Sequence, residues 1–325
     1  MINKFWSGKK VVVTGGAGFI GSHVVESLVD RGADVTVLDN LQNGSSSNLE
    51  SVRGKYKLIN GSCIDDDSLK KALKNKEIVL NIAARVGGIE YNRLHQATMM
   101  RDNLLIGTKV IEAARIAGVE RFLVVSSACV YPRDCSIPTP ESEGFDSEPE
   151  STNGGYGWAK RMAEKLGSYY AEEFGMKVSI VRPYNCYGPR DHFDPELSHV
   201  IPALIKRVYD GENPVNVWGS GKQTRAFLYV TDMAEGMIRA IEKYPKPDPV
   251  NLGTDDEISI KELIKKIIDI SGIKTKVTYD LSKPDGSPRR NSDNTFAKNK
   301  IGFTAKISLD QGLKNTIDWY AKNIR

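Results

Sequence analysis

Short apolar runs recur along the first half of the chain and predict buried β-strands. They are rich in valine, isoleucine and leucine, and stretches compatible with helices separate them. This alternation is typical of a parallel sheet with helices on both faces. The runs cover residues 10–14, 34–40, 55–60, 77–84, 121–127 and 177–182.

Other segments interrupt the alternation and are rich in proline, glycine, asparagine and arginine. They cover residues 131–155, 183–231 and roughly 253–304. In a doubly wound sheet such material collects beyond the carboxyl ends of the strands, where ligands bind. We therefore expect a Rossmann-type α/β domain over residues 1–182, with a returning strand near 249–252. A smaller, mostly C-terminal α/β substrate-binding domain is expected over residues 183–325.

A glycine-rich turn follows the first predicted strand. Gly15, Gly18 and Gly21 leave room for a pyrophosphate to approach the backbone, and the helix that starts there offers amide donors. The second strand ends in Asp39, whose carboxylate can accept both hydroxyls of an adenosine ribose and would repel a 2′-phosphate. The pattern predicts NAD rather than NADP as the cofactor.

Tyr156 and Lys160 are spaced to lie one turn apart on a predicted helix over residues 156–174. That segment lacks proline and has apolar residues at helical spacing, namely Leu166, Tyr169, Tyr170 and Phe174. A lysine ammonium beside the phenol should lower the tyrosine pKa from about 10 towards neutrality. Such a tyrosine can take a hydroxyl proton and return it. The spacing also arises by chance, but the glycine turn and Ser127 at the end of an apolar run favour catalysis.

Composition narrows the class of protein. The chain has 325 residues, 40% of them hydrophobic and 26% charged, which is ordinary for a soluble globular protein. The net charge of +4 comes from dispersed lysines, so we expect no nucleic-acid surface. No apolar run is long enough to span a membrane. The four cysteines show neither metal-ligand spacing nor a disulfide framework, which predicts a cytoplasmic protein without a metal site.

Several motifs together resemble the extended short-chain dehydrogenase/reductases that modify nucleotide sugars. They are TGGAGFIG at 14–21, NIAA at 81–84, SSACVYP at 126–132 and YGWAK at 156–160. The resemblance implies that Ser127, Tyr156 and Lys160 act on a sugar hydroxyl while the nicotinamide takes the hydride. It also implies an NAD pocket that includes Phe19, Ile20, Asn40, Ala83, Ala84 and Asn103.

Two subfamilies match different stretches of the chain. WGSGKQTRAF at 218–227 and RRNSDN at 289–294 look like GDP-mannose 3,5-epimerase, whereas AARVGGI at 83–89, SHVIPAL at 198–204 and KPDGSPR at 283–289 look like GDP-L-fucose synthase. Fucose synthase consumes NADPH, which Asp39 disfavours. We therefore expect first a GDP-mannose 3,5-epimerase that oxidises C4, exchanges the protons at C3 and C5, and reduces C4 again.

Inversion at C3 or C5 needs a base on one face of the ring and an acid on the other. Cys129 lies two residues after Ser127, and on an extended strand the two would share a side. His199 is the predicted partner, with a pKa suited to either role. The plant mannose epimerase uses a lysine for that task, so the sequence leaves open which centres are inverted.

Substrate contacts are assigned to four residues. Arg225 and either Arg289 or Arg290 are expected to grip the diphosphate, because guanidinium groups bind phosphate oxygens in pairs. Asn185 resembles the asparagine that the family places near the sugar diphosphate. Guanine as the base is implied only by the resemblance, as is a homodimer formed through helices near 93–117 and 156–174.

The residues expected to contact the adenine of the cofactor differ from the family pattern. Many relatives carry an aspartate after the third strand, where this chain has Ser62 and Cys63. Asp65 or Asp66 could substitute for it.

Two further alternatives remain open. A UDP-sugar 4-epimerase would need Ser127, Tyr156, Lys160 and NAD, and would leave Cys129 and His199 without a role. An NAD-binding sensor module would have kept the fold without catalysis.

Overall fold

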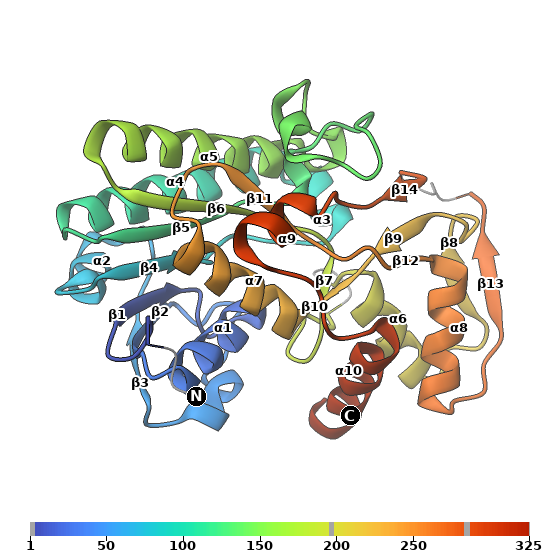
Figure 1. Ribbon diagram of the computed structural model, residues 1–325. Coiled ribbons are helices and arrows are strands. Elements are labelled where there is room, and N and C mark those ends of the chain that lie inside the picture. Colours follow the sequence, from blue (N-terminus) through green and yellow to red (C-terminus); the bar gives the residue numbers. More distant parts are fainter. Residues whose placement is uncertain (1–3, 195–197, 283–286, 325) are drawn as a thin grey trace.

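The computed structural model describes residues 4–194, 198–282 and 287–324. Parallel strands form a seven-stranded central sheet in the order β11-β6-β5-β4-β1-β2-β3 (Figure 1). The strands are β1 Lys10–Thr14, β2 Asp34–Asp39, β3 Tyr56–Asn60, β4 Ile78–Asn81, β5 Arg121–Val125, β6 Lys177–Pro183 and β11 Pro249–Leu252. The strand order reverses between β1 and β4, where a doubly wound sheet binds its ligand. The predicted fold class is confirmed.

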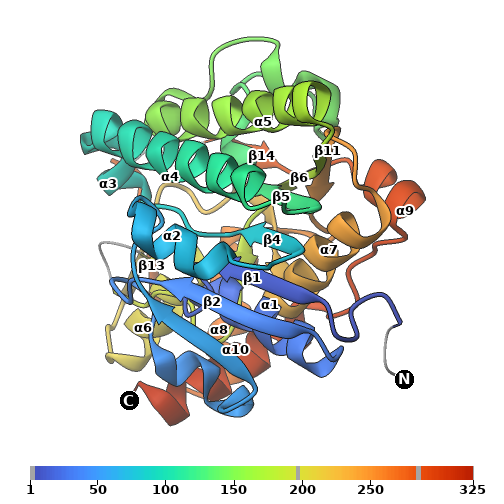
Figure 2. The same ribbon diagram turned by 90° about the vertical axis from the view of Figure 1, so that its left-hand side faces the viewer.

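Helices cover both faces of this sheet (Figure 2). One face carries α2 Asp66–Leu73, α4 Gln96–Ile116 and α5 Gly154–Phe174, and the other carries α1 Phe19–Asp30, α7 Val230–Lys243 and α9 Thr295–Ile301. Successive residues of a strand enter opposite layers, because side chains alternate along a strand. Val12 packs under α2 and α4, whereas Val11 and Val13 pack under α1 and α7.

The rest of the chain forms a second part beside the sheet, on the right in Figure 1. Its short strands pair as β7 Cys186–Tyr187 with β10 Leu228–Tyr229, as β9 Thr224–Ala226 between β12 Glu257–Ser259 and β14 Arg289–Arg290, and as β8 Val215–Trp218 with β13 Val277–Asp280. The helices α6 Val200–Tyr209, α8 Ile260–Ser271 and α10 Leu309–Asn323 enclose its own apolar core. Phe19 and Ile20, at the start of α1, also pack against this core, so the glycine turn touches both parts.

Three elements that follow residue 183 nevertheless belong to the central sheet and its covering helices. β11 pairs with β6 in parallel, which is the returning strand expected near 249–252. α7 and α9 pack on the same face as α1. A division of the chain at residue 183 therefore assigns most residues to the correct part, but it misplaces β11, α7 and α9.

Helix α5 begins at Gly154, two residues before the predicted start, and ends at Phe174 as expected. The apolar spacing that predicted it marks its buried face only in part, because Leu166 and Tyr170 pack against the core whereas Tyr169 and Phe174 are 59% and 44% exposed. The fully buried positions on this face include Lys160, Glu164 and Gly167. A Cβ at Gly167 would lie 3.0 Å and 3.2 Å from two valines of the sheet, so the helix lies very close to the strands.

A buried ion pair holds α5 to the sheet. Arg182 of β6 donates from Nε and Nη2 to the Glu164 carboxylate at 2.8 Å and 2.7 Å, and both side chains are almost fully buried. Arg182 Nη1 donates to the Tyr131 hydroxyl at 2.9 Å, and that hydroxyl donates to Asn251 Oδ1 at 2.6 Å. One network therefore joins α5, β6, β11 and the loop after β5.

Among the described residues, none of the helices combines the length and the apolar character that crossing a bilayer requires.

Glu164→Gln should lower the free energy of unfolding by about 3–5 kcal/mol, because Arg182 would keep its charge in the interior without a counter-ion. Urea denaturation followed by circular dichroism would measure this. Asp318→Asn is the matched control, since its pair with Lys314 is exposed and should contribute under about 1 kcal/mol. Equal losses in the two variants would contradict the role given to the buried pair.

Candidate active site

The glycine turn is shaped by close backbone contacts. Gly15 has a φ of +67°, and a Cβ there would lie 2.9 Å from the backbone of Ala83. A Cβ at Gly21 would lie 2.0 Å from the carbonyl oxygen of Gly15. Gly18 is the N-cap of α1 and has no side chain to shield the amides of the first turn. These amides and the helix dipole can bind a pyrophosphate.

Asp39 ties the end of β2 to this turn. Its Oδ2 accepts from the Ala17 amide and its Oδ1 accepts from the Leu41 amide, both at 2.9 Å. Each carboxylate oxygen retains a second lone pair that can accept a ribose hydroxyl. Asn40 is exposed, and its side chain accepts from the Gln42 amide at 3.1 Å.

The two acidic residues considered for the adenine edge have other partners. Asp65 caps α2 by accepting from the Ser68 amide, and Asp66 pairs with Lys109 at 2.7 Å. Cys63 is buried near Asp39, and its burial, with that carboxylate, raises the pKa of the thiol to about 12. The geometry thus favours neither aspartate as a substitute for the family's acid.

The side-chain amide of Asn103 forms two hydrogen bonds to the loop that follows β4. Its Oδ1 accepts from the Arg85 amide at 3.1 Å, and its Nδ2 donates to the Arg85 carbonyl at 3.0 Å. Just before Arg85, the amide of Ala83 donates to the Thr14 hydroxyl at 3.2 Å, and Ala84 is half-buried. Asn103 therefore holds the loop that carries Ala83 and Ala84, so in our proposal its part in cofactor binding is indirect.

The structure brings Ser127, Cys129 and Tyr156 together, although not by the alternation of a strand. β5 ends at Val125, and Ser127 caps a 3-10 turn, η2 Ala128–Val130, so the premise that Cys129 continues an extended strand is wrong. The Ser127 hydroxyl accepts from the Cys129 amide at 3.1 Å and lies close to the Tyr156 phenol. A Cβ at Gly157 would lie 2.5 Å from the Cys129 carbonyl oxygen, so η2 rests directly on α5.

Burial opposes the ionisation of both Tyr156 and Lys160. Desolvation raises the pKa of Tyr156, a nearby Cys129 adds to the effect, and the hydrogen bond from Ser127 opposes it. Desolvation also lowers the pKa of Lys160 to about 8. Its Nζ donates to the Val125 carbonyl at 2.8 Å and lies 5.4 Å from the centre of the Tyr156 ring. The expectation that Lys160 brings the tyrosine pKa near neutrality is wrong for the protein alone, because desolvation raises this pKa and the lysine ammonium donates to the Val125 carbonyl.

The arginines fall into two environments. Arg290 lies close to the Cys129 side chain and donates to the Ala128 carbonyl at 2.8 Å. It lies opposite Arg225 in the parallel pairing of β9 and β14, and burial together with Arg290 lowers the pKa of Arg225 to about 10. Like charges placed opposite each other repel, and an anion between them would relieve this. Arg289 points outward and pairs with Glu257 at 2.7 Å.

Asn185 and His199 lie in the second part of the molecule. The Asn185 amide donates to the Ala226 carbonyl at 2.9 Å, which places it beside the strand of Arg225. His199 is the N-cap of α6 and is exposed at the surface. No hydrogen bond or ion pair between described residues joins His199 to the cluster around Tyr156.

Asp191 is a buried acid that the sequence did not single out. Its Oδ1 accepts from the His192 amide at 2.7 Å, while its Oδ2 is buried without a hydrogen-bond partner. Burial raises the pKa of this carboxyl to about 8. The adjacent Arg190, with a φ of +71°, donates to Glu26 and Ser22 of α1 and holds this loop on the dinucleotide part. An aspartate in a polar loop gives no signal of burial in the sequence.

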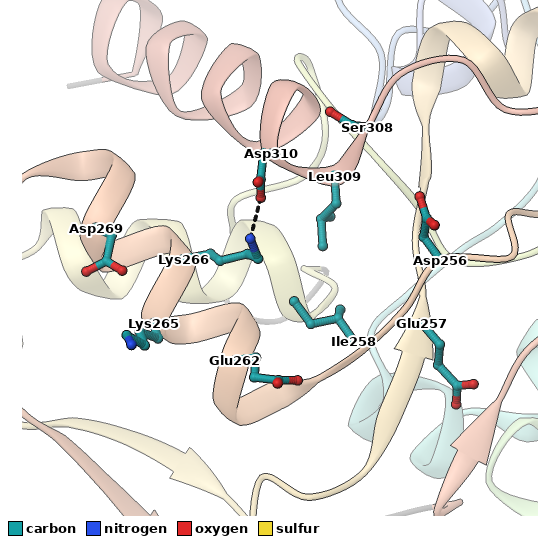
Figure 3. Close-up of a pocket in the computed structure, with 10 residues that line it drawn as sticks. All are labelled: Asp256, Glu257, Ile258, Glu262, Lys265, Lys266, Asp269, Ser308, Leu309 and Asp310. Atoms are coloured by element: carbon teal, nitrogen blue, oxygen red, sulfur yellow. Dashed lines mark hydrogen bonds and ion pairs between the residues drawn. The ribbon is translucent and has the colours of Figure 1, made fainter.

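A separate hollow of about 570 Å³ lies between α8 and the start of α10 (Figure 3). Most of its lining residues are charged, and Lys266 pairs with Asp310 across it at 2.6 Å. They are Asp256, Glu257, Ile258, Glu262, Lys265, Lys266, Asp269, Ser308, Leu309 and Asp310. It contains none of the predicted site residues, and no group of metal-ligating side chains occurs in the described parts of the chain.

Comparison with known proteins places these features in context. The model of the "NAD dependent epimerase/dehydratase family" matches residues 11–253. GDP-L-fucose synthase 1 of Arabidopsis thaliana is 35% identical over 97% of this chain and 94% of its own length. GDP-mannose 3,5-epimerase 1 of Oryza sativa subsp. indica is 29% identical over 99% of this chain and 84% of its own. The structure of the Thermotoga maritima UDP-glucose 4-epimerase with UDP-glucose superposes with a TM-score of 0.88 at 30% identity, covering 97% of this chain and 99% of that one.

Asp191 should make the protein less stable as the pH rises. Its carboxyl keeps its proton in the folded state up to about pH 8, whereas the unfolded chain loses it near pH 4. The free energy of unfolding should therefore fall between these values, by up to about 1.4 kcal/mol per pH unit from this group. Asp191→Asn should remove this slope in urea denaturation between pH 5 and pH 8. The exposed Asp256→Asn should leave it unchanged, and a slope that persists in Asp191→Asn would contradict the assignment.

Proposed function

Since the chain belongs to the NAD-dependent epimerase/dehydratase family of enzymes, we propose that it is an epimerase of the GDP-mannose 3,5-epimerase type. One observation carries the proposal. A thiol, Cys129, lies close to Arg290 and to the cluster of Ser127, Tyr156 and Lys160. Oxidation and reduction at C4 need only Ser127, Tyr156, Lys160 and the cofactor. A thiol beside this cluster therefore supports a further proton transfer, at C3 or C5 of the sugar.

The residues around the glycine turn fit NAD, which takes a hydride from the sugar and returns it. The open first turn of α1 at Gly18 would hold the pyrophosphate, and Asp39 would accept the ribose hydroxyls. A Cβ at Gly15 or Gly21 would collide with the backbone that forms this turn. The chain therefore supplies the donors, the acceptor and the space that the dinucleotide requires.

In this proposal Tyr156 removes the proton of the C4 hydroxyl and later returns it. The Lys160 ammonium and the positive charge of an oxidised nicotinamide both favour the phenolate, against the desolvation that raises its pKa. The Ser127 hydroxyl, which lies close to the phenol, would orient the sugar hydroxyl. A C4 ketone then makes the protons on C3 and C5 acidic.

Cys129 and His199 are the proposed acid and base for C3 and C5. Cys129 lies next to Arg290 and to the cluster around Tyr156, from where its sulfur would exchange a proton with one face of the ring. His199 would meet the opposite face of the ring from the start of α6. An imidazole is mostly neutral at pH 7 and can then accept a proton.

The diphosphate of a nucleotide sugar is the anion that suits Arg225 and Arg290. Arg225 already donates to the Thr224 and Ser287 carbonyls, at 2.7 Å and 2.8 Å, which holds its guanidinium at the strand end. Asn185 lies on the neighbouring segment and would contact the same group. Arg289 is left out, because Glu257 already pairs with it at the surface.

We further propose a cytoplasmic homodimer formed through α4 and α5. The helices α4 and α5 lie side by side (Figures 1 and 2). Large apolar side chains are exposed on both of them. Ile116 is 71% exposed, Tyr169 59% and Leu105 40%. Burial of such side chains in an interface stabilises a dimer.

The second candidate is an enzyme of the GDP-L-fucose synthase type, supported by 35% identity. It would consume NADPH, which Asp39 disfavours. A UDP-sugar 4-epimerase, supported by the similarity to the Thermotoga maritima structure, would need neither Cys129 nor His199.

The deciding experiment incubates the protein with GDP-mannose and, separately, UDP-glucose in heavy water without added cofactor. We expect deuterium at C3 and C5 of GDP-mannose by NMR. Cys129→Ala should slow this incorporation by about 10²- to 10⁴-fold, because proton transfer loses its acid or base. Cys135→Ala is the control for removal of a thiol.

Three other outcomes would overturn the proposal. Turnover only with added NADPH would favour the fucose synthase. Inversion of UDP-glucose at C4 without incorporation of deuterium would favour the 4-epimerase. Full activity of Cys129→Ala would remove the thiol from the mechanism.

Tyr156→Phe should lower kcat by about 10²- to 10⁴-fold without changing the free energy of unfolding appreciably, because only the proton-transferring oxygen is lost. Steady-state assays and urea denaturation measure the two effects. The exposed Tyr169→Phe on the same helix is the matched control. A Tyr156→Phe variant with unchanged turnover would favour the non-catalytic NAD-binding module.

A further inference from the structure

Tyr156 lies in the first turn of α5, the part of a helix that is held least firmly. The helix begins at Gly154, so the tyrosine is its third residue. The first amides of a helix have no partner within it and need acceptors from elsewhere. The side chain of Asn153, the residue before α5, accepts no hydrogen bond from the described amides of this turn. The turn that carries the tyrosine therefore depends on another part of the chain.

Gln96, the first residue of α4, provides these contacts. Its Oε1 accepts from the amide of Gly155 at 2.6 Å, and Gly155 directly precedes Tyr156. Its Nε2 donates to the carbonyl oxygens of Ser151 and Thr152, at 3.0 Å and 3.2 Å, in the segment that leads into α5. One side-chain amide thus holds residues on both sides of the point where the helix starts.

The backbone also packs closely at this point. A Cβ at Gly155 would lie 2.2 Å from the carbonyl oxygen of Gln96, so the starts of α4 and α5 touch. The short helix α3 Ile89–Leu94 adds a polar contact, in which Asn92 Nδ2 donates to Asn153 Oδ1 at 2.9 Å. The glutamine side chain therefore acts within a fitted contact between the two helices and not at a loose surface.

The later turns of α5 have anchors of their own. Lys160 Nζ donates to the Val125 carbonyl at 2.8 Å, and Glu164 forms the buried pair with Arg182. Tyr156 lies between Lys160 and the residues that Gln96 holds. Removal of the glutamine side chain should therefore leave the later turns in place and let the first turn shift.

We infer that Gln96 is a positioning residue, which holds the phenol oxygen of Tyr156 where it can take the proton of the sugar hydroxyl. This role rests on the proposed function, in which Tyr156 transfers that proton. Gln96 itself transfers no proton and acts only through the tyrosine. A reacting group that is displaced by about 1 Å can lose about 10²-fold in rate, so a contact to the adjacent residue matters.

A double-mutant cycle tests this role. Gln96→Ala should lower kcat for GDP-mannose by about 10- to 100-fold, because the phenol is no longer held in place. KM should stay within about twofold, because the proposed diphosphate contacts of Arg225 and Arg290 are made by other elements. In the Tyr156→Phe background the same change should cost less than about twofold, because no proton-transferring oxygen is left to position. NMR of the sugar protons during long incubations measures the slow variants.

The matched control is Gln311→Ala, which removes an exposed glutamine from the first turn of α10 and should change neither kcat nor KM. Urea denaturation shows whether each variant is folded. If Gln96→Ala does not fold, Gln96→Met gives the same comparison, because it keeps the length of the side chain and removes both polar atoms.

A general disturbance of the site would lower turnover by the same factor with and without the Tyr156 hydroxyl. Equal factors in the two backgrounds, or an unchanged kcat in Gln96→Ala, would therefore overturn the inference.

Failure of the proposed function gives a different pattern. If only UDP-glucose is turned over, the same cycle is measured on that sugar, where Tyr156 would still serve C4, and its outcome decides in the same way. A wild type that turns over neither sugar, or a Tyr156→Phe variant with unchanged turnover, would remove the proposed function and the role of Gln96 together.

Discussion

The geometry of the candidate site depends on the buried ion pair between Arg182 and Glu164. Glu164 lies one turn after Lys160 and two turns after Tyr156, so anchoring it to β6 fixes the position of both along α5. Two fully buried charges are tolerated there because the bidentate contact is completed by Tyr131. Asn251 extends the same network to β11. The sheet, the catalytic helix and the loop over it are thus held by one set of polar contacts.

Close backbone packing is the second constraint. Gly157 lets the turn of Cys129 rest on α5, and Gly155 lies so near to α4 that a Cβ would be 2.2 Å from the Gln96 carbonyl oxygen. Gly15 and Gly21 have the same role between the dinucleotide turn and its neighbours. Because these segments come from distant parts of the chain, the site is assembled only when the whole sheet has formed.

Burial disfavours the charged forms of several ionisable groups of the site. The pKa of Tyr156 is raised, that of Lys160 is lowered, and that of Asp191 is raised, each chiefly by desolvation. A bound nicotinamide and a diphosphate would bring charges of both signs into the same region, where the low dielectric makes them effective. In the proposed mechanism, substrate and cofactor therefore help to set the ionisation of the residues that act on them.

The sequence alone determined the Rossmann-type sheet, the glycine turn, the identity of NAD and the pairing of Tyr156 with Lys160. These features depend on local spacing, namely apolar runs, glycines and a four-residue interval on one helix. The tertiary structure decided which side of α5 is buried, that Arg290 rather than Arg289 adjoins Cys129, and that Asp191 and Asn92 keep unpartnered buried oxygens. It also reversed the expected direction of the Tyr156 pKa. Such properties come from desolvation and from contacts between segments far apart in the chain, which no local pattern records.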